Sequence, residues 1–382
     1  MTVEEKVEIR KGLKDVYFDK TESSFIDGTA GKLLYRGYNI HDLAEHSTFE
    51  ETSYLLLYGS LPTRAQLDEF DALLRGSRAI SNEIEKIIGL TKDSHPMDVL
   101  RTAVSAIVSQ NGTAGDSTPE ASLDRGVGII GKVATIVAAH DRIRRGKVHI
   151  QPNQNFGHAA NFLYMLSGET PDPKDAALVD KDFVLHAEHG VNASTLAVRV
   201  AASTGADIYA SITAGLAALK GPKHGGAAEG AMKMSQSIGS EENVGEWVES
   251  TLNNGGRLPG FGHPVYKALD PRSLHLKEAA RDLSKRRGQP KWFSIIQALT
   301  ETKRMKSRAR LGVHPNVDLW AGAIYSLLGI PDDLFVPLFA IGRTPGWVAH
   351  FLEQMAHKDI LRPRLLYDGP HDLEYSQIGD RT

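Results

Sequence analysis

The amino-acid sequence predicts an all-α protein with one small β-hairpin near its N-terminus, and three observations support this fold class. Apolar residues recur at helical spacing, as in the stripe of Leu67, Phe70, Leu73 and Leu74. Helix-start patterns precede such stripes, as Thr63-Arg-Ala-Gln66 does here. Strand-like segments are confined to the beginning of the chain.

The hairpin is expected where two short segments flank a glycine-bearing loop. Ser24–Asp27 and Lys32–Arg36 lie on either side of Gly28-Thr-Ala-Gly31, a pattern typical of two strands joined by a short connection. Beyond this hairpin the patterns are helical.

Three further helices are marked by their first residues. Ser47-Thr-Phe-Glu50 has the form of a capping box before Tyr54–Tyr58, and Gly59 is placed to end that helix. Proline in the first turn marks the other two starts, at Ser94-His-Pro96 and Thr118-Pro119.

Composition and charge argue against several classes of protein. The chain has 382 residues and a net charge of −3, so we expect neither nucleic acid nor an anionic membrane as a partner. Cysteine is absent, which removes disulfides, thiolate metal sites and cysteine nucleophiles, and fits a reducing compartment. Met1–Lys6 lacks the apolar core of a signal peptide, and the most apolar run, Val127–His140, is too short and interrupted to span a bilayer. We therefore expect a soluble, cytoplasmic protein.

The distribution of glycine suggests two domains. Glycine density changes after Lys220, whereas no glycine/serine linker and no internal repeat is visible. We expect a large helical domain formed by residues 1–221 and 321–382, and a smaller helical domain formed by residues 222–320.

Two histidines of the predicted smaller domain lie beside glycine and proline. His224 precedes Gly225-Gly226 and a helical stretch, whose first backbone amides would hold the ring neutral and favour negative charge nearby. His263 lies in Leu258–Pro264, where closely spaced glycines let a ligand approach the backbone. The alternative for His224 is an incidental histidine on a surface turn, and the alternative for His263 is a tight turn with a solvated basic face.

A carboxylate follows further along the chain. Asp318 stands at the head of the apolar stretch Leu319–Ile324. It is either an ordinary helix N-cap or a general base whose pKa is tuned by burial.

His186-Ala-Glu-His189 has a spacing that could place both rings on one helix face. A metal site would need a third ligand, and the His-Glu-x-x-His pattern is absent. We predict no metal here, and expect the pair to cap helices or to bind a carboxylate.

Two late arginine segments are candidates for carboxylate binding, because a guanidinium can bind a carboxylate through two parallel hydrogen bonds. Arg343 is expected on a glycine/proline turn before a helix, and Arg362 lies near the C-terminus. Each could instead be a solvated surface charge.

Taken together and in this order, these segments resemble the citrate synthase family. The resemblance runs from Tyr35-Arg36-Gly37 to Arg362-Pro363 and looks like the compact bacterial and archaeal branch. The matching motifs are Leu185-His-Ala-Glu-His189 with Asn192-Ala-Ser-Thr195, Gly221-Pro-Lys-His-Gly-Gly226, Pro259-Gly-Phe-Gly-His-Pro-Val-Tyr266, Asp270-Pro-Arg272, Pro315-Asn-Val-Asp318 and Arg343-Thr-Pro-Gly-Trp-Val-Ala-His350.

The resemblance implies an α-helical homodimer whose small domain moves over an active-site cleft. It assigns the catalytic triad to His224, His263 and Asp318. It assigns binding of oxaloacetate carboxylates to His189, Arg272, Arg343 and, from the other subunit, Arg362. It places Arg257, Gly260, Gly262 and Lys267 near coenzyme A, with acetyl-CoA as cosubstrate and no permanently bound cofactor.

The implied reaction is condensation of acetyl-CoA with oxaloacetate, followed by hydrolysis of citryl-CoA to citrate and coenzyme A. Asp318 would act as the base, His224 would stabilise the enol or enolate, and His263 would donate to the oxaloacetate carbonyl.

Two departures from the family pattern leave the acyl-CoA preference open. Glu188-His189-Gly190 stands where many members have Asp-His-Glu, and Leu319-Trp320 stands where many have Phe-Tyr. The alternatives are a 2-methylcitrate synthase that uses propionyl-CoA, a non-catalytic sensor of the same fold that binds acyl-CoA or a carboxylate, and citryl-CoA lyase chemistry.

Overall fold

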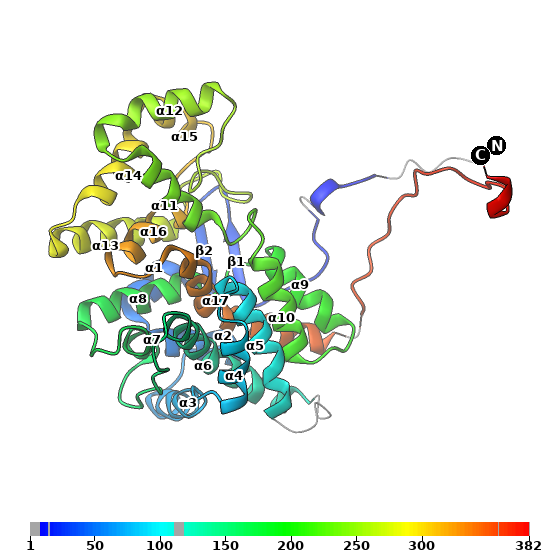
Figure 1. Ribbon diagram of the computed structural model, residues 1–382, viewed down its shortest axis with the longest axis horizontal. Helices are drawn as coiled ribbons and strands as arrows, with labels where there is room; N and C mark the ends of the chain where they lie inside the picture. The colour runs from blue at the N-terminus through cyan, green and yellow to red at the C-terminus, as the bar shows by residue number, and fades with distance from the viewer. Residues whose placement is uncertain (1–7, 14–15, 111–117, 358, 382) are drawn as a thin grey trace.

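The computed structural model describes residues 8–13, 16–110, 118–357 and 359–381 (Figure 1). This part of the chain contains 17 α-helices and one three-stranded sheet, so the predicted all-α class with a small β element is confirmed. The helices are α1 (Ile40–His46), α2 (Phe49–Tyr58), α3 (Arg64–Gly76), α4 (Asn82–Leu90), α5 (Pro96–Ala106), α6 (Pro119–Arg144), α7 (His158–Ser167), α8 (Pro173–His186), α9 (Ala193–Ser203), α10 (Ile208–Leu219), α11 (Ala227–Ile238), α12 (Val244–Asn253), α13 (Pro271–Arg287), α14 (Lys291–Glu301), α15 (Lys303–Ala309), α16 (Val317–Leu327) and α17 (Phe335–Ala356).

The predicted hairpin is present and is extended by a short third strand. Strands β1 (Ser24–Asp27), β2 (Lys32–Tyr35) and β3 (Tyr38–Asn39) pair antiparallel in that order. Gly31 has φ +64°, a backbone conformation that suits glycine and reverses the chain between β1 and β2.

Local capping signals predict helix starts well, with one exception. Thr63 and Gln66 form the predicted capping box, and Gly59 ends α2 at φ +86°. The predicted box at the start of α2 is wrong, because Thr48 is the N-cap and its Oγ1 accepts from Glu51 N. Glu50 cannot complete a box because its carboxylate turns inward and accepts from His158 N at 2.7 Å.

Helix α17 lies at the centre of the larger group of helices. It packs against α2, α6, α8, α9 and α10, and most of its length is buried. Glycines allow two of these contacts. A Cβ on Gly126 of α6 would lie 2.5 Å from Val348, and one on Gly342 would lie 3.0 Å from the Cβ of His186 in α8. Large apolar side chains such as Trp347 are fully buried here, and each contributes roughly 1.5–3 kcal/mol of transfer free energy.

Figure 1 shows α11 to α16 grouped at one end of the molecule, with α16 packed against α11 and α13. The expected domain boundary near residue 320 falls inside α16. Beyond α17 the chain runs away from the helices and exposes apolar side chains such as Leu365 and Tyr375. Among the described helices, none is long and apolar enough to cross a membrane.

Candidate active site

Backbone hydrogen bonds join the two segments that carry His263 and Asp318. Gly262 N donates to His314 O at 2.8 Å, and Asn316 N donates to Gly260 O at 2.9 Å. The Asn316 side chain adds a third bond, from Nδ2 to Gly262 O at 2.9 Å. These cross-links hold the loop before α13 against the start of α16, so the two predicted catalytic groups belong to one local structure.

The glycines of this loop fit its backbone closely. Gly260 and Gly262 have φ values of +81° and +80°. A Cβ on Gly260 would lie 2.9 Å from the Cα of Leu319, which a side chain cannot tolerate. Gly260 is therefore required for the contact with α16, whatever it contributes to ligand binding.

His263 is set up as a neutral hydrogen-bond donor. Its Nδ1 accepts from Val265 N at 3.0 Å and from Tyr266 N at 3.2 Å, so in the neutral ring the proton resides on Nε2. Burial, together with Arg272, lowers the pKa of His263 to about 4. The ring is therefore uncharged at neutral pH and presents an Nε2–H group.

His224 is also held neutral, in the turn before α11. Its Nε2 lies 2.8 Å from Ser194 Oγ, and Trp347 Nε1 donates to the same hydroxyl at 3.3 Å. Burial, with a contribution from Arg343, lowers the pKa of His224 to about 4. Ser194 and Trp347 were not assigned roles from the sequence, although both lie in motifs that carried the resemblance.

Asp318 is not the N-cap of α16. Asn316 is the N-cap, and its Oδ1 accepts from Asp318 N at 3.1 Å, so the N-cap alternative for Asp318 is wrong. Burial raises the pKa of Asp318 to about 6, although His186 and Arg272 act in the opposite direction. The carboxyl can therefore both accept and release a proton near neutral pH.

His189 and Arg272 lie beside His263. The ring centroids of His189 and His263 are 5.0 Å apart, and His189 Nε2 lies 3.2 Å from Tyr266 Oη. Arg272 donates to Asp270, the N-cap of α13, through Nε at 3.0 Å and Nη2 at 2.8 Å. Burial acts to lower the pKa of Arg272, but Asp270 outweighs it and the net shift is upward. Arg272 is thus a fixed, buried cation.

Arg343 lies inside α17 rather than on the expected turn, because burial of this helix overrides the helix-breaking tendency of Pro345 and Gly346. Its Nε donates to His186 O at 2.6 Å, whereas no described residue accepts a hydrogen bond from Nη1. Burial lowers its pKa to about 10, with Glu188 opposing that shift. A buried cation with an open donor is suited to a ligand carboxylate.

Phe339 is a further site residue that sequence reasoning missed. Its ring centroid lies 4.8 Å from that of His186 and 6.4 Å from that of His224, and 4.8 Å from Cζ of Arg343. It lies one turn before Arg343 on α17, and its single ring neighbours all three of these groups. A lone apolar residue in a buried helix carries no sequence signal for such a role.

The expectation that His186 and His189 share a helix face is wrong, because α8 ends at His186. His186 Nδ1 lies 2.9 Å from Asp182 O, whereas His189 turns toward Tyr266. Across the described ranges, no three His, Cys, Asp or Glu side chains are grouped so that they could hold a metal ion.

Three predicted cationic residues lie at the surface. Arg257 and Lys267 are exposed on the loop that leads to His263 and beyond it, and Arg362 is exposed after α17. Lys267 is anchored through its backbone, because its N–H donates to Gly28 O at 2.8 Å. A Cβ on Gly28 would lie 2.2 Å from Val265 O, so the turn of the N-terminal hairpin supports the His263 loop closely. This contact was not predicted.

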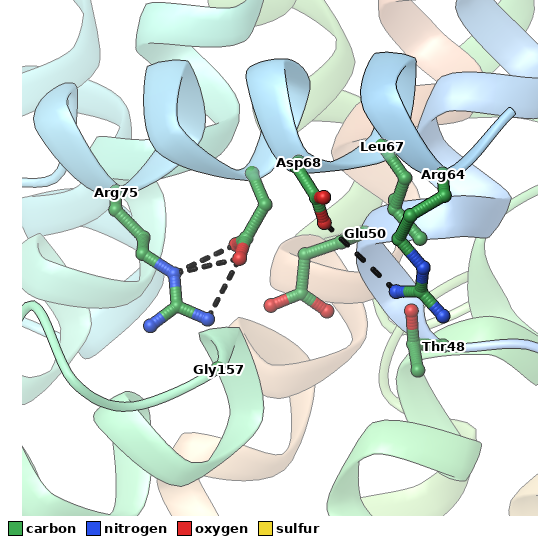
Figure 2. A pocket seen from close by; sticks show the side chains of 8 residues that line it. Thr48, Glu50, Arg64, Leu67, Asp68, Arg75 and Gly157 are labelled. Atoms are coloured by element: carbon green, nitrogen blue, oxygen red, sulfur yellow. Dashed lines mark hydrogen bonds and ion pairs between the residues drawn. The ribbon is translucent and has the colours of Figure 1, made fainter. Parts of the chain in front are cut away.

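A separate pocket of about 210 Å³ lies between α2, α3 and Gly157 (Figure 2). Its charged side chains are largely matched with one another. Arg75 Nη2 lies 2.7 Å from Asp71, and Arg64 lies 3.9 Å from Asp68. None of the predicted site residues lines it, so it is not the candidate active site.

Comparison with known proteins identifies the family. The family model described as citrate synthase, C-terminal domain, matches residues 12–364. The chain belongs to the citrate synthase family. It is 41% identical to citrate synthase of Synechocystis sp. over 98% of this chain and 94% of that protein, and 39% identical to citrate synthase of Haloferax volcanii over 98% and 99%. It is also 38% identical to 2-methylcitrate synthase 2 of Corynebacterium glutamicum over 98% of both chains.

Solved citrate synthase structures share this fold. Citrate synthase from Pyrobaculum aerophilum matches with a TM-score of 0.88 and 40% identity over 97% of this chain and 95% of that one. The ternary complex of citrate synthase from Thermoplasma acidophilum with carboxymethyl-coenzyme A and oxaloacetate matches with a TM-score of 0.93 and 33% identity, over 98% and 100%. The resemblance drawn from the sequence motifs is confirmed.

Proposed function

We propose that this protein condenses acetyl-CoA with oxaloacetate and hydrolyses the resulting citryl-CoA to citrate and coenzyme A. The observation that carries this proposal is one site with a carboxyl of raised pKa, two neutral histidines and buried guanidinium groups. Proton abstraction next to a thioester needs a base and donors for the developing oxyanion, and the site offers both.

Asp318 removes a proton from the acetyl methyl group, because its raised pKa makes it a stronger base than a solvated aspartate. His224 donates to the thioester oxygen as the enol or enolate forms. The neutral ring has one N–H, so Nδ1 of His224 can donate to the substrate only when Nε2 accepts from Ser194 Oγ, 2.8 Å away. The Ser194 hydroxyl, which lies 2.7 Å from its acceptor Asn192 Oδ1, must then turn its proton toward His224.

Oxaloacetate is the second substrate, and His263, Arg343, Arg272 and His189 are proposed to bind it. Nε2–H of His263 donates to its ketone oxygen as the carbon–carbon bond forms. Arg343 supplies an open guanidinium donor for one carboxylate, and Arg272 and His189 bind beside it. Fixed cations orient the substrate and offset its charge without reorganisation during the reaction.

For coenzyme A, we infer that Arg257 and Lys267 contact its phosphates and that the backbone of Gly260 and Gly262 approaches the nucleotide. Both cations are exposed on either side of the His263 loop, which supports this assignment. A relative solved with a coenzyme A analogue and oxaloacetate also supports these substrates.

We propose that residues 222–320 form a small domain that closes over the substrates. The contacts that would cross its seam with the large domain include two made by α13. His41 Nδ1 lies 2.8 Å from His275 Nε2, and Arg286 Nη2 lies 2.7 Å from Asp175 Oδ1. If the domain moves, X-ray scattering should show a smaller radius of gyration after oxaloacetate is added; no change would refute the movement.

We also propose a homodimer in which Arg362 of the partner subunit completes each site. The exposed segment after α17, which leads away from the helices, supports this arrangement. Arg362→Ala and His263→Ala subunits, each inactive alone, should regain activity when combined in verified heterodimers. An inactive heterodimer would refute the shared site.

The lack of cysteine supports a cytoplasmic location.

The direct test is release of free thiol from acetyl-CoA, which should require oxaloacetate. Thermal stabilisation by the substrates without turnover would instead favour a non-catalytic sensor. Cleavage of citryl-CoA to acetyl-CoA as the main activity would favour lyase chemistry.

The second candidate is a 2-methylcitrate synthase, because relatives with that name match nearly the whole chain. Propionyl-CoA adds one methyl group next to the reacting carbon. A kcat/KM for propionyl-CoA at least about tenfold above that for acetyl-CoA, about 1.4 kcal/mol, would move the assignment to that enzyme.

A further inference from the structure

The motif from Arg343 to His350 contains more than the substrate-binding arginine. On α17, residues three, four and seven positions apart lie on one face, so Gly346, Trp347 and His350 share the face of Arg343. Trp347 reaches Ser194, as described above. The roles of Gly346 and His350 follow from Glu188, which comes just after α8.

Glu188 is a carboxylate without solvent exposure. Its Oε1 accepts from His350 Nε2 at 3.0 Å, from Ser24 Oγ at 3.0 Å and from Gly190 N at 2.5 Å. A Cβ on Gly346 would lie 2.5 Å from its Oε2, so glycine at this position makes room for the carboxylate. Helix α17 thus accommodates Glu188 with one residue and binds it with another.

The tautomer of His350 follows from its second neighbour. Its Nδ1 lies 3.3 Å from Nη1 of Arg199, and a guanidinium can only donate. The carboxylate of Glu353 also faces Nδ1, but at 3.6 Å it lies beyond hydrogen-bond distance. Nδ1 therefore accepts, and Nε2 carries the proton that is donated to Glu188. Arg199 is itself held by Glu353, at 3.3 Å, and by Asp19. His350 is consequently fixed in one orientation, with its N–H directed at Glu188.

Glu188 acts on the site through the turn that contains it. Its bond to Gly190 N spans His189 and closes the turn that contains this residue. The ring of His189 lies beside Tyr266 and His263. Burial alone would raise the pKa of Glu188, but His350 and Arg343 outweigh burial and lower it. Glu188 therefore stays ionised, and its charge stabilises the buried Arg343 without occupying its open Nη1 donor.

We propose that Glu188 and His350 form a positioning pair for the dicarboxylate substrate, fixing the His189 turn and balancing the charge of Arg343 without touching the substrate. This inference rests on the proposed function, because it assigns a role in oxaloacetate binding. The pair is distinct from the catalytic groups, so it should act on KM for oxaloacetate and leave kcat nearly unchanged.

The test compares His350→Leu, His350→Gln and the control His357→Leu in the full-length protein. Leucine removes the donor, whereas the glutamine amide can replace Nε2–H, and His357 is an exposed histidine just after α17. We expect His350→Leu to raise KM for oxaloacetate at least about tenfold with kcat within about threefold, and His350→Gln to restore most of the loss. The control should match the wild type.

Ser24→Ala provides a milder variant if His350→Leu does not fold, since it removes one hydroxyl donor to Glu188 from the hairpin. It should raise KM for oxaloacetate in the same direction, by a smaller factor. An unchanged KM in a folded variant, or kcat that falls as much as kcat/KM with no rescue by glutamine, would overturn the inference. Absence of turnover in the wild type would instead overturn the proposed function and, with it, this role.

Discussion

The α8/α17 wall, which comprises Glu188, His189, Arg343 and His350, differs in construction from the loop wall, which comprises His263 and Asp318. In the α8/α17 wall, the end of α8 packs against α17, and its groups are buried in the core of the larger group of helices. In the loop wall, turns with positive-φ glycines are cross-linked by backbone bonds between residues 260–262 and 314–316.

Under the proposed function, this difference would separate two tasks. A cation that binds a dicarboxylate must be shielded from water and held in a fixed position, and a packed helical core can do both. Groups that move protons must meet the reacting atoms, and loops on the edge of a structural unit can approach a ligand closely. Changes in the loop wall should therefore act on kcat, whereas changes in the α8/α17 wall should act on KM.

The largest expected effect comes from Asp318→Asn in the loop wall. Loss of the base should lower kcat by roughly 10²–10⁴-fold, with KM for oxaloacetate nearly unchanged. Because burial raises the pKa of Asp318 from 3.8 to about 6, the folded state favours the protonated carboxyl. The free energy of unfolding therefore falls as the pH rises from 3.8 to about 6 and stays lower at higher pH. The variant should therefore melt at the same or a higher temperature than the wild type at pH 7.5. A kcat near the wild-type value would contradict the assignment.

Arg343→Lys in the α8/α17 wall should raise KM for oxaloacetate by about 10–100-fold, because an ammonium group cannot reproduce the fork geometry of a guanidinium. The effect on kcat should be much smaller than that of Asp318→Asn. Steady-state kinetics with acetyl-CoA at saturation measure both constants. Equal loss of kcat in the two variants would contradict the assignment of substrate binding to the α8/α17 wall and of proton transfer to the loop wall.

The pH dependence should come from the loop wall. With the pKa of Asp318 at about 6, protonation below that pH removes the base, so kcat/KM should fall about tenfold per pH unit well below 6. His224 and His263, with pKa values lowered to about 4, stay neutral over this range and add no second step. A profile measured from pH 5 to 9 should therefore show one acidic limb. A flat profile down to pH 5 would contradict this reasoning.

The smallest expected effect is on stability. Gly260→Ala adds a strained left-handed conformation, roughly 1–2 kcal/mol, and a contact with the backbone of Leu319. Gly255→Ala is a matched control, because Gly255 has φ +73° but nothing within 4 Å of an added Cβ. Thermal melts should show a larger loss for Gly260→Ala. Equal losses would mean that the contact with α16 contributes nothing.

Features decided by neighbouring residues could be predicted from the sequence. The capping box of Thr63 and Gln66 depends on four consecutive residues, and the starts of α5 and α6 depend on a proline in the first turn. The start of α2 was off by one residue because the inward turn of Glu50 depends on His158, about a hundred residues later.

Contacts between distant segments could not be predicted by the same reasoning. The bond between His224 and Ser194, and that between Gly28 and Lys267, follow from tertiary packing, which local patterns do not encode. The residues of the candidate site are proposed because their motifs match a family, whereas their neighbours Phe339, Ser194 and His350 are recognised only in three dimensions.

The central position of α17 has a consequence for how the chain folds during synthesis. The helices that surround it, from α2 to α10, are made first, and their apolar faces stay uncovered until residues 335–356 follow. Contacts across such long sequence separations slow folding and leave intermediates exposed to aggregation. The larger group of helices therefore cannot finish folding before α17 has been synthesised. A nascent chain that stops before α17 should be a strong substrate for chaperones.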